Sequence, residues 1–223
     1  MKWIISNLKM NFTLPTILEY EKNLSQIKTT NKLVVLPSYL YLPFFKGNNY
    51  YLGSQGVSSH ENGSYTGEVS AAQLSSLNVK YTIINHPEST EKNIEQQLIN
   101  LFKYNITPIL CISDTKQTSI ETSLNNIFNN IKEIGDIILT FEPIESIGTG
   151  YITPVKQIEQ VISIIKDWFI VNYNKSVPVL YGGSVSVDNI KILNNIPNLD
   201  GILLGSNSLK IDNLKQIISK MEV

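Results

Sequence analysis

The 223-residue sequence contains no arginine, and all 18 of its basic residues are lysines. An anion site in this protein therefore has no guanidinium group and must use lysine, backbone N–H groups and the N-termini of helices. The net charge is −1 at pH 7, so the chain as a whole does not attract polyanions. We expect no nucleic acid and no membrane among its partners.

Cysteine is almost as scarce. Cys111 has no second cysteine with which to form an intramolecular disulfide, which favours a reducing compartment. It lies in an apolar run and is interpreted as a strand-packing residue, not as a nucleophile. His60 and His86 are far apart in the sequence, and His60 lies in a polar stretch. With so few soft ligands we expect no metal site.

Long apolar runs are also missing. Lys166 and Asp167 interrupt the longest candidate before it reaches the ~18 residues that a membrane span needs. The apolar start at Trp3 is too short for a signal peptide, because Asn7 and Lys9 follow it. The apolar fraction of 42% and the mean hydropathy of −0.02 are typical of a globular protein. We expect a cytoplasmic location.

Short apolar runs alternate eight times with stretches of helical periodicity, the pattern of parallel strands covered on both faces. The expected strands cover residues 3–7, 33–36, 50–55, 81–85, 107–111, 137–142, 177–181 and 201–204. The expected helices cover residues 15–27, 39–45, 71–77, 90–104, 119–134, 153–174, 187–193 and 209–221. This alternation, with no linker, predicts an α/β fold and a closed (β/α)₈ barrel, a single domain over residues 1–223. A doubly wound open sheet is the alternative.

Helix boundaries are predicted from local signals. Thr153-Pro154 and Ser119 are expected to begin two helices, and Asn105 and Gly135 to follow the ends of two others.

In such a barrel the C-terminal ends of the strands carry the chemistry. The residues at those ends are Asn7, Lys9, Gln55, His86, Glu142, the run from Tyr181 to Ser184, and Gly205. The segment Ile137 to Gly150 is the most informative, because a buried strand ends in Glu142, followed by Pro143 and a glycine-hinged loop. Burial strengthens a carboxylate as a base and a moving loop excludes water, so we predict a general base beneath a lid. A strand-end glutamate in a surface salt bridge is the alternative.

Two further side chains are candidates for electrophilic roles. Lys9 can supply positive charge to an anionic substrate or to an enolate oxygen, the alternative being a solvated lysine. His86 precedes Pro87, which is typical of the first position of a helix. We expect the N–H of Glu88 to donate to the imidazole and the helix dipole to disfavour its protonation, which would leave a neutral hydrogen-bond donor. A structural histidine is the alternative.

Glycine-containing turns follow the last two expected strands, at Gly182-Gly183-Ser184 and at Gly205-Ser206. Such turns let backbone N–H groups approach a phosphate, and the helical turn after Gly205 directs its dipole at the anion. Ordinary tight turns are the alternative.

Taken in order, these segments resemble the triosephosphate isomerase family over essentially the whole chain. The matching strings are Asn7-Leu8-Lys9-Met10-Asn11, Tyr65-Thr66-Gly67-Glu68, the His86 segment, Phe141-Glu142-Pro143, Ile147-Gly148-Thr149-Gly150, Tyr181-Gly182-Gly183-Ser184-Val185 and the segment from Gly201 to Lys210. The resemblance implies interconversion of dihydroxyacetone phosphate and D-glyceraldehyde 3-phosphate through an enediolate, with no cofactor and no metal.

The resemblance also implies the role of each residue. Glu142 would be the base and His86 the neutral electrophile, a pairing already known for this family. Lys9 would stabilise negative charge, Asn7 would orient the substrate, and Glu88 would be a further active-site glutamate. Lid closure would press Ile147 and Leu203 against Glu142. The residues that would hold the phosphate through backbone N–H groups are Gly148, Ser184, Gly205 and Ser206.

The loop from Gly63 to Glu68 matches the family's dimer loop, whose threonine, here Thr66, reaches the active site of the neighbour. The resemblance therefore implies a homodimer; an ordinary exposed turn is the alternative.

The chain departs from the family pattern at the lid. Glu145 stands in place of a tryptophan, Phe141 in place of a tyrosine and Asp114 in place of a glutamate, which removes the usual hydrogen-bonded latch. We expect Glu145 to turn outward or to pair with a lysine, leaving Tyr181 and Ser184 to hold the lid. Ser206 and Ser89 replace a glycine and an arginine, and the shorter chain is expected to be trimmed at residues 39–45.

Two other functions remain open on this sequence. One is a barrel that binds a phosphorylated metabolite without turning it over. The other is an aldolase that forms a Schiff base at Lys9.

Overall fold

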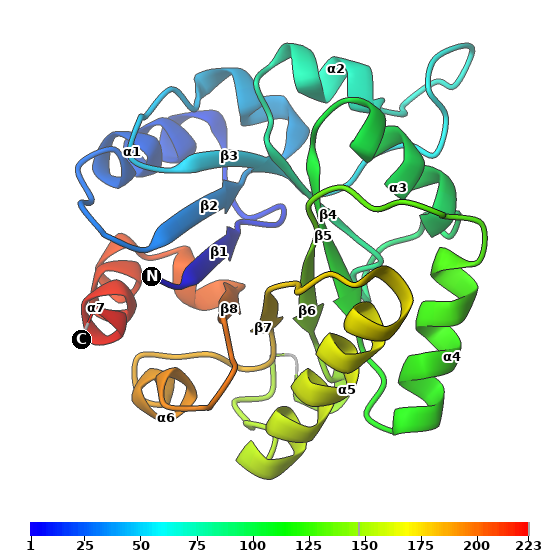
Figure 1. The fold of residues 1–223 in the computed structure, drawn as a ribbon. Helices are drawn as coiled ribbons and strands as arrows, with labels where there is room; N and C mark the ends of the chain where they lie inside the picture. The colour runs from blue at the N-terminus through cyan, green and yellow to red at the C-terminus, as the bar shows by residue number, and fades with distance from the viewer. Residues whose placement is uncertain (147, 223) are drawn as a thin grey trace.

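The computed structural model describes residues 1–146 and 148–222. Eight parallel strands form a closed barrel in chain order, and β8 returns to pair with β1, for example Ile4 with Ile202 (Figure 1). The strands are β1 (Trp3–Asn7), β2 (Lys32–Leu36), β3 (Tyr51–Ser54), β4 (Tyr81–Ile84), β5 (Thr107–Ile112), β6 (Ile138–Phe141), β7 (Val179–Tyr181) and β8 (Gly201–Leu204). The predicted (β/α)₈ barrel is confirmed, and the open sheet is excluded because β1 and β8 are paired.

Helices surround the barrel in an outer ring (Figure 1). The α-helices are α1 (Leu14–Leu24), α2 (Ala71–Ser76), α3 (Ile94–Lys103), α4 (Gln117–Phe128), α5 (Val155–Tyr173), α6 (Ile190–Asn194) and α7 (Ile211–Met221). Three short 3₁₀ helices accompany them, η1 (Tyr39–Phe44), η2 (Ile144–Ser146) and η3 (Ser206–Ser208). The helix predicted at residues 39–45 is thus a six-residue 3₁₀ helix with Pro43 inside it.

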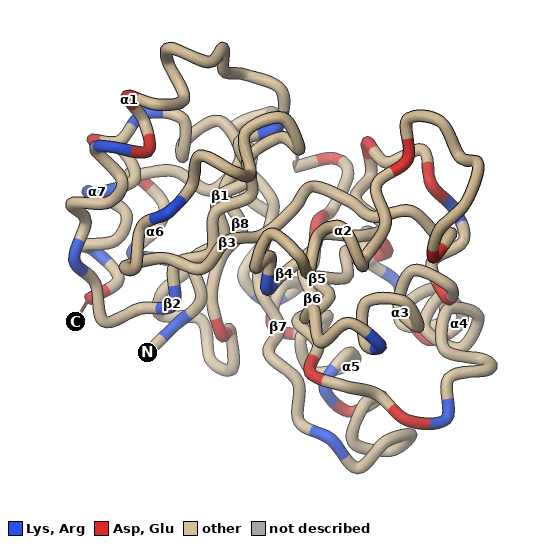
Figure 2. Tube along the Cα trace, turned by 90° about the horizontal axis from the view of Figure 1, so that it is seen from above, with Lys and Arg blue, Asp and Glu red and all other residues tan. Residues whose placement is uncertain are grey.

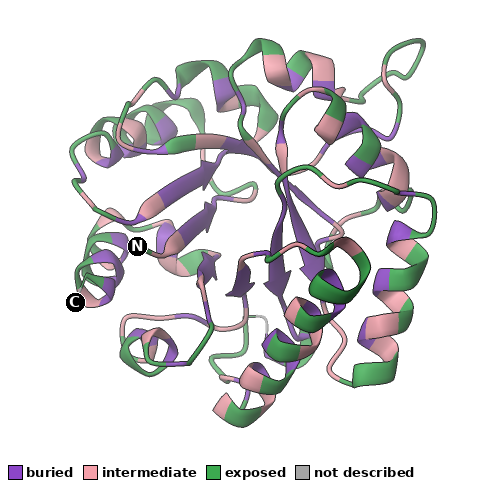
Figure 3. Ribbon diagram, in the orientation of Figure 1, coloured by how far each residue is buried: buried purple, intermediate pink, exposed green. Residues whose placement is uncertain are grey.

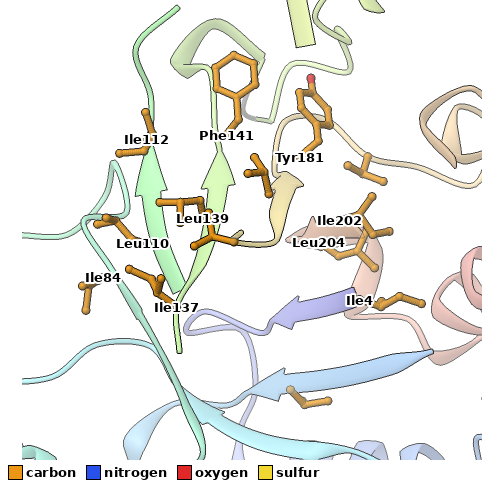
Figure 4. Packing of buried hydrophobic residues seen from close by; sticks show 14 of the residues in the cluster. Ile4, Ile84, Leu110, Ile112, Ile137, Leu139, Phe141, Tyr181, Ile202 and Leu204 are labelled. Carbon is orange, nitrogen blue, oxygen red and sulfur yellow. The ribbon is translucent and has the colours of Figure 1, made fainter. Parts of the chain in front are cut away.

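The strands are buried on both faces, as their continuous apolar pattern predicts (Figure 3). Successive side chains alternate between the two faces of a strand, so the buried residues form two clusters. The inner cluster consists of Ile5, Val34, Leu36, Ile83, Ile109, Cys111, Ile138, Leu180 and Leu203. The outer cluster lies between the strands and the helices, where Ile84, Leu110 and Leu139 contribute from β4, β5 and β6 (Figure 4). Charged residues of both signs are spread over the outer part of the molecule (Figure 2).

Several helix boundaries were predicted wrongly. The helix expected from residue 90 begins at Ile94, because the Glu91 carboxylate accepts the N–H groups of Lys92 and Asn93 and keeps that segment out of the helix. The side chain of Asn93 then accepts the N–H of Gln96 as an N-cap.

Two other helices also begin or end at residues other than the predicted ones. Helix α4 begins at Gln117, two residues before Ser119, and ends at Phe128, well before Gly135. Pro154 is the N-cap of α5, so that helix begins at Val155, two residues after the predicted start at residue 153. Asn105 follows α3 with a left-handed φ of 53°, as its place after a helix predicts.

Candidate active site

A cavity of ≈ 380 Å³ opens at the C-terminal ends of the strands. Seven of the predicted site residues line it, namely Lys9, His86, Glu142, Gly148, Ser184, Gly205 and Ser206. The eighth, Asn7, ends β1 and lines an adjoining cavity together with Lys9 and His86. The fold therefore brings residues from five separate βα units to one place.

Glu142 directly follows β6, and its side chain is only 1% exposed. Its backbone N–H donates to the carbonyl of Ile112 at 2.9 Å, which extends the β5–β6 pairing and fixes where the side chain begins. The carboxylate oxygen Oε2 lies 3.2 Å from Nε2 of His86. Glu142 is therefore a buried carboxylate that faces the cavity, not a surface ion-pair partner.

The backbone decides which nitrogen of His86 can act as a donor. The N–H of Glu88 donates to Nδ1 at 3.2 Å, as predicted, so Nδ1 is an acceptor and Nε2 is the nitrogen that can donate. The predicted reason is wrong, however, because no helix starts at Pro87. The donor belongs to a turn closed by the Ser89 N–H and the His86 carbonyl at 2.8 Å, so a local turn and not a helix start positions this donor against the imidazole.

Lys9 is directed into the site by an unusual backbone conformation. Its φ is +48°, a left-handed value that few non-glycine residues adopt. The Asn7 side chain accepts the Lys9 N–H at 3.0 Å, and the Gln55 amide donates to the Lys9 carbonyl at 2.9 Å. Both contacts hold the strained residue in place.

The Lys9 ammonium group donates to Glu88 at 2.6 Å. That hydrogen bond is the main cause that holds the pKa of Glu88 below its ordinary value. A charged, paired ammonium group is thus available at the cavity wall.

Cys111 makes a contact with the candidate base that the sequence pattern does not predict. Its thiol donates to Oε1 of Glu142 at 2.8 Å, and the residue is completely buried, as expected for strand packing. Burial, and secondarily the neighbouring carboxylate, raises the pKa of the Cys111 thiol well above its ordinary value. The thiol is therefore a neutral donor, not a nucleophile.

The two glycines after β7 leave room for other side chains. A Cβ atom at Gly182 would lie 2.5 Å from Cγ of Glu142, and one at Gly183 would lie 2.2 Å from the Tyr181 hydroxyl. Real Cβ atoms essentially never approach other atoms this closely, so a side chain at either position would force its neighbours to shift. This is a second reason for the Gly-Gly pair besides the predicted access to backbone N–H groups.

The candidate phosphate-binding residues all line this cavity. Gly148 has a φ of +71°, and the N–H of Gly150 donates to the Ser184 hydroxyl at 2.9 Å. Gly205 is the N-cap of η3, whose first residue is Ser206. A Cβ at Gly205 would lie 3.9 Å from Cε of Lys9, so the lysine side chain passes along this segment.

The three positions at which the lid region departs from the family pattern each have surroundings of their own. Glu145 is exposed, and within residues 1–146 and 148–222 it forms no ion pair. Asp114 accepts a hydrogen bond from Ser123 at 2.8 Å. Phe141 packs near Tyr181, with the ring centroids 6.1 Å apart (Figure 4). Glu145 thus turns outward, one of the two expectations; Ile147 lies outside the described residues.

The loop from Gly63 to Glu68 is exposed throughout. Tyr65 stacks on His60 with a centroid separation of 3.6 Å and an interplanar angle of 4°, which gives the loop an internal contact. Met10, which follows Lys9 in the sequence, is 93% exposed.

Within the described part of the chain, no group of three or more histidine, cysteine, aspartate or glutamate side chains has the arrangement of a metal site. None of the helices described is long and apolar enough to cross a membrane.

Comparison with known proteins agrees with this geometry. A family model described as triosephosphate isomerase matches residues 2–221. The chain is 34% identical to a triosephosphate isomerase of Mesomycoplasma hyorhinis, with 97% of each chain covered. It is 32% identical to the enzyme of that name from the Wolbachia of Brugia malayi, over 98% of this chain and 97% of the relative. A third relative with this name, from Francisella philomiragia, is 28% identical over 98% of the chain and 96% of its own length. The barrel, the site and these relatives together show that the chain belongs to the triosephosphate isomerase family and is an isomerase.

Proposed function

We propose that the protein interconverts dihydroxyacetone phosphate and D-glyceraldehyde 3-phosphate, as a single catalytic domain over residues 1–223. The observation that carries the proposal is the 3.2 Å approach of the buried Glu142 carboxylate to Nε2 of His86 inside a cavity that also contains the Lys9 ammonium group. A base, a neutral donor and a cation in one cavity are the groups that an enediolate intermediate requires.

Glu142 removes a proton from the carbon next to the substrate carbonyl, and the resulting carboxylic acid returns that proton to the neighbouring carbon. His86 donates a hydrogen bond from Nε2–H to the oxygen on which negative charge develops, in the arrangement known for this family. Lys9 stabilises the same charge, and Asn7 orients the substrate. The proton that Glu142 removes from the substrate is returned to it, and His86 and Lys9 stabilise the charge, so the scheme uses no cofactor and no metal.

The phosphate group is bound by backbone N–H groups of Gly148, Ser184, Gly205 and Ser206. This assignment is supported by their place in the lining of the cavity that also contains Lys9, whose side chain passes close to Gly205. In a chain without arginine, backbone donors and a lysine are the available phosphate ligands. The lid holds water away from the enediolate, which otherwise loses its phosphate.

We further propose a homodimer formed through the loop from Gly63 to Glu68. The exposed Tyr65 and Met10 support it, because both offer apolar surface to a partner. The cytoplasm is the proposed location, in agreement with a free buried thiol at Cys111.

A Schiff-base aldolase is a weaker alternative. Its nucleophile must be an uncharged amine, whereas the ammonium group of Lys9 is ion-paired with Glu88 at 2.6 Å. Borohydride reduction in the presence of substrate distinguishes the two functions, because only the aldolase leaves a covalent adduct on Lys9.

The proposed function is tested by a coupled isomerase assay of the purified protein beside its Glu142→Asp variant. The shorter side chain withdraws the carboxylate from the substrate carbon, and a misplacement on the order of 1 Å costs about 10²-fold in kcat. We expect turnover that collapses in the variant while KM changes little. A folded protein that binds phosphoglycolate but shows no turnover would indicate the binding-only barrel.

A further inference from the structure

Two buried hydroxyl groups join the two ends of the lid. Ser146 is the last residue of η2, and Thr153 lies two residues before α5. Their side-chain oxygens are 2.8 Å apart, and the two residues are 0% and 1% exposed. Residues 148–151, which lie between them in sequence, are all exposed. The lid is therefore closed at its base by a buried contact between two side chains.

The same contact is connected to the barrel. The N–H of Thr153 donates to the Tyr181 hydroxyl at 3.1 Å, and that hydroxyl donates to the side-chain oxygen of Thr153 at 3.3 Å. Tyr181 is the last residue of β7 and is completely buried, with its ring next to that of Phe141 (Figure 4). Ser146, Thr153 and Tyr181 thus form a continuous hydrogen-bonded network inside a dry environment, where such bonds are strongest.

Packing around this network leaves no spare volume. A Cβ at Gly183 would lie 2.2 Å from the Tyr181 hydroxyl and 3.1 Å from Cβ of Ser146. The absence of a side chain at Gly183 is therefore what lets the lid residue Ser146 and the barrel residue Tyr181 approach each other.

The network also continues toward the candidate base. The N–H of Ser146 donates to the carbonyl of Pro143 at 2.9 Å, in a single tight turn that begins one residue after Glu142. On the other side, the Thr149 hydroxyl donates to the carbonyl of Ser146 at 3.2 Å. Ser146 is thus bonded both to the segment that positions the carboxylate and to the exposed part of the lid.

We propose that the Ser146–Thr153 hydroxyl pair, held by Tyr181, is a positioning clamp for the isomerisation, which fixes the base of the lid and leaves residues 148–152 as its moving part. The inference rests on the proposed function and identifies what anchors the lid of this chain, in which Glu145 points to solvent and Asp114 bonds to Ser123. A fixed base keeps the closed lid complementary to the enediolate. Loss of the clamp therefore raises the fraction of turnovers in which water enters and phosphate is eliminated.

The test compares Ser146→Ala and Thr153→Val, each of which removes one hydroxyl. The readouts are kcat, KM, and the inorganic phosphate released per isomerisation. We expect each variant to raise phosphate release per turnover by about two- to tenfold, the range that corresponds to one net hydrogen bond. The double variant should resemble the more affected single variant, since both remove the same contact. Thr153→Ser, which keeps the hydroxyl, should restore the ratio.

Ser54→Ala is the matched control. Ser54 and Thr82 form another fully buried hydroxyl pair at 2.8 Å, on β3 and β4, away from the lid. This variant should be destabilised about as much as Ser146→Ala, but its phosphate release per turnover should stay unchanged. If Ser54→Ala gives the same rise, or if Ser146→Ala releases phosphate like the parent, the clamp is refuted.

Amide hydrogen exchange tests the clamp without substrate and separates it from the proposed function. Exchange at the N–H of Thr153 should accelerate in Ser146→Ala and stay unchanged in Ser54→Ala. Absence of isomerase activity in the parent protein overturns the proposed function alone, whereas equal exchange in all three proteins overturns the clamp alone.

Discussion

The thiol of Cys111 donates a hydrogen bond to the carboxylate of Glu142, with 2.8 Å between Sγ and Oε1, and both side chains are buried. Because β5 and β6 are paired, this donor has a fixed position relative to the base. The contact leaves Oε2 as the oxygen that faces His86 at 3.2 Å. One carboxylate oxygen is thus anchored in the barrel, and the other is presented to the cavity.

Removal of that donor should weaken both stability and catalysis. For Cys111→Ala we expect the free energy of unfolding to fall by roughly 1 kcal/mol, since a buried side chain is truncated and a buried oxygen loses its donor. We also expect kcat to fall by about two- to tenfold because Oε1 is no longer held. Urea denaturation and the isomerase assay measure the two effects. Cys111→Ser, which keeps a donor, should retain more activity than Cys111→Ala; the reverse order would contradict an anchoring role.

Gly182→Ala should reduce activity while the barrel remains folded. The new Cβ would lie 2.5 Å from Cγ and 3.0 Å from Cδ of Glu142, so the carboxylate has to move. A shift of this size places the base outside bonding range of the substrate carbon, and we expect kcat to fall by about 10²-fold. Circular dichroism and a steady-state assay together check this. Normal kcat in a folded Gly182→Ala protein would show that Glu142 acts from another position.

The Glu88–Lys9 pair should make the free energy of unfolding depend slightly on pH in the acidic range. The pKa of Glu88 is lower in the folded protein than its ordinary value of 4.5, so its contribution is present above that value. It is lost as the pH falls through the lower, folded-state pKa. The Glu88 side chain is 60% exposed, which keeps the effect small because water screens the pair.

The measurement is the free energy of unfolding of the parent and of Glu88→Gln between about pH 6 and about pH 3. The difference between the two proteins should be constant at the upper end of this range and should shrink toward zero at the lower end. A difference that grows on acidification has the wrong sign for this pair.

Thr66→Arg should separate the proposed dimer. Thr66 lies in the exposed loop from Gly63 to Glu68, and a long charged side chain cannot be desolvated in a small interface pocket without a cost of several kcal/mol. Sedimentation velocity should show a dimer for the parent and a monomer for the variant. Ser163→Arg, on the exposed face of α5, is the control and should leave the dimer intact. A parent protein that sediments as a monomer would refute the dimer itself.

Much of this protein was predictable because its informative residues lie where strands end. Continuous apolar runs predicted the eight strands. A closed parallel barrel brings the residues at the C-terminal ends of its strands together. Lys9, His86 and Glu142 could therefore be assigned to one cavity. Helix starts were less predictable, because the start of α3 depends on hydrogen bonds that the side chains of Glu91 and Asn93 accept from backbone N–H groups, and these outweigh a proline signal.

Contacts between units could not be predicted at all. The Cys111–Glu142 contact depends on the register of β5 against β6, where Cys111 lies opposite Thr140. The Ser146–Thr153 pair depends on how the chain folds back between β6 and α5. Neither follows from the periodicity of a single segment, since periodicity reports on one element and these contacts join two.

The short distance between Gly182 and Glu142 has a consequence for how this barrel can vary. Positions 142 and 182 divide a single volume between them, since the Cγ of one occupies the space that a Cβ of the other would fill. The side-chain conformation at position 142 and the bulk at position 182 are therefore one variable instead of two. A descendant of this sequence that acquired alanine at 182 could not recover the space by shortening the acid to aspartate, because aspartate keeps a Cγ atom, and it could keep an acid in the cavity only with a different side-chain conformation at 142.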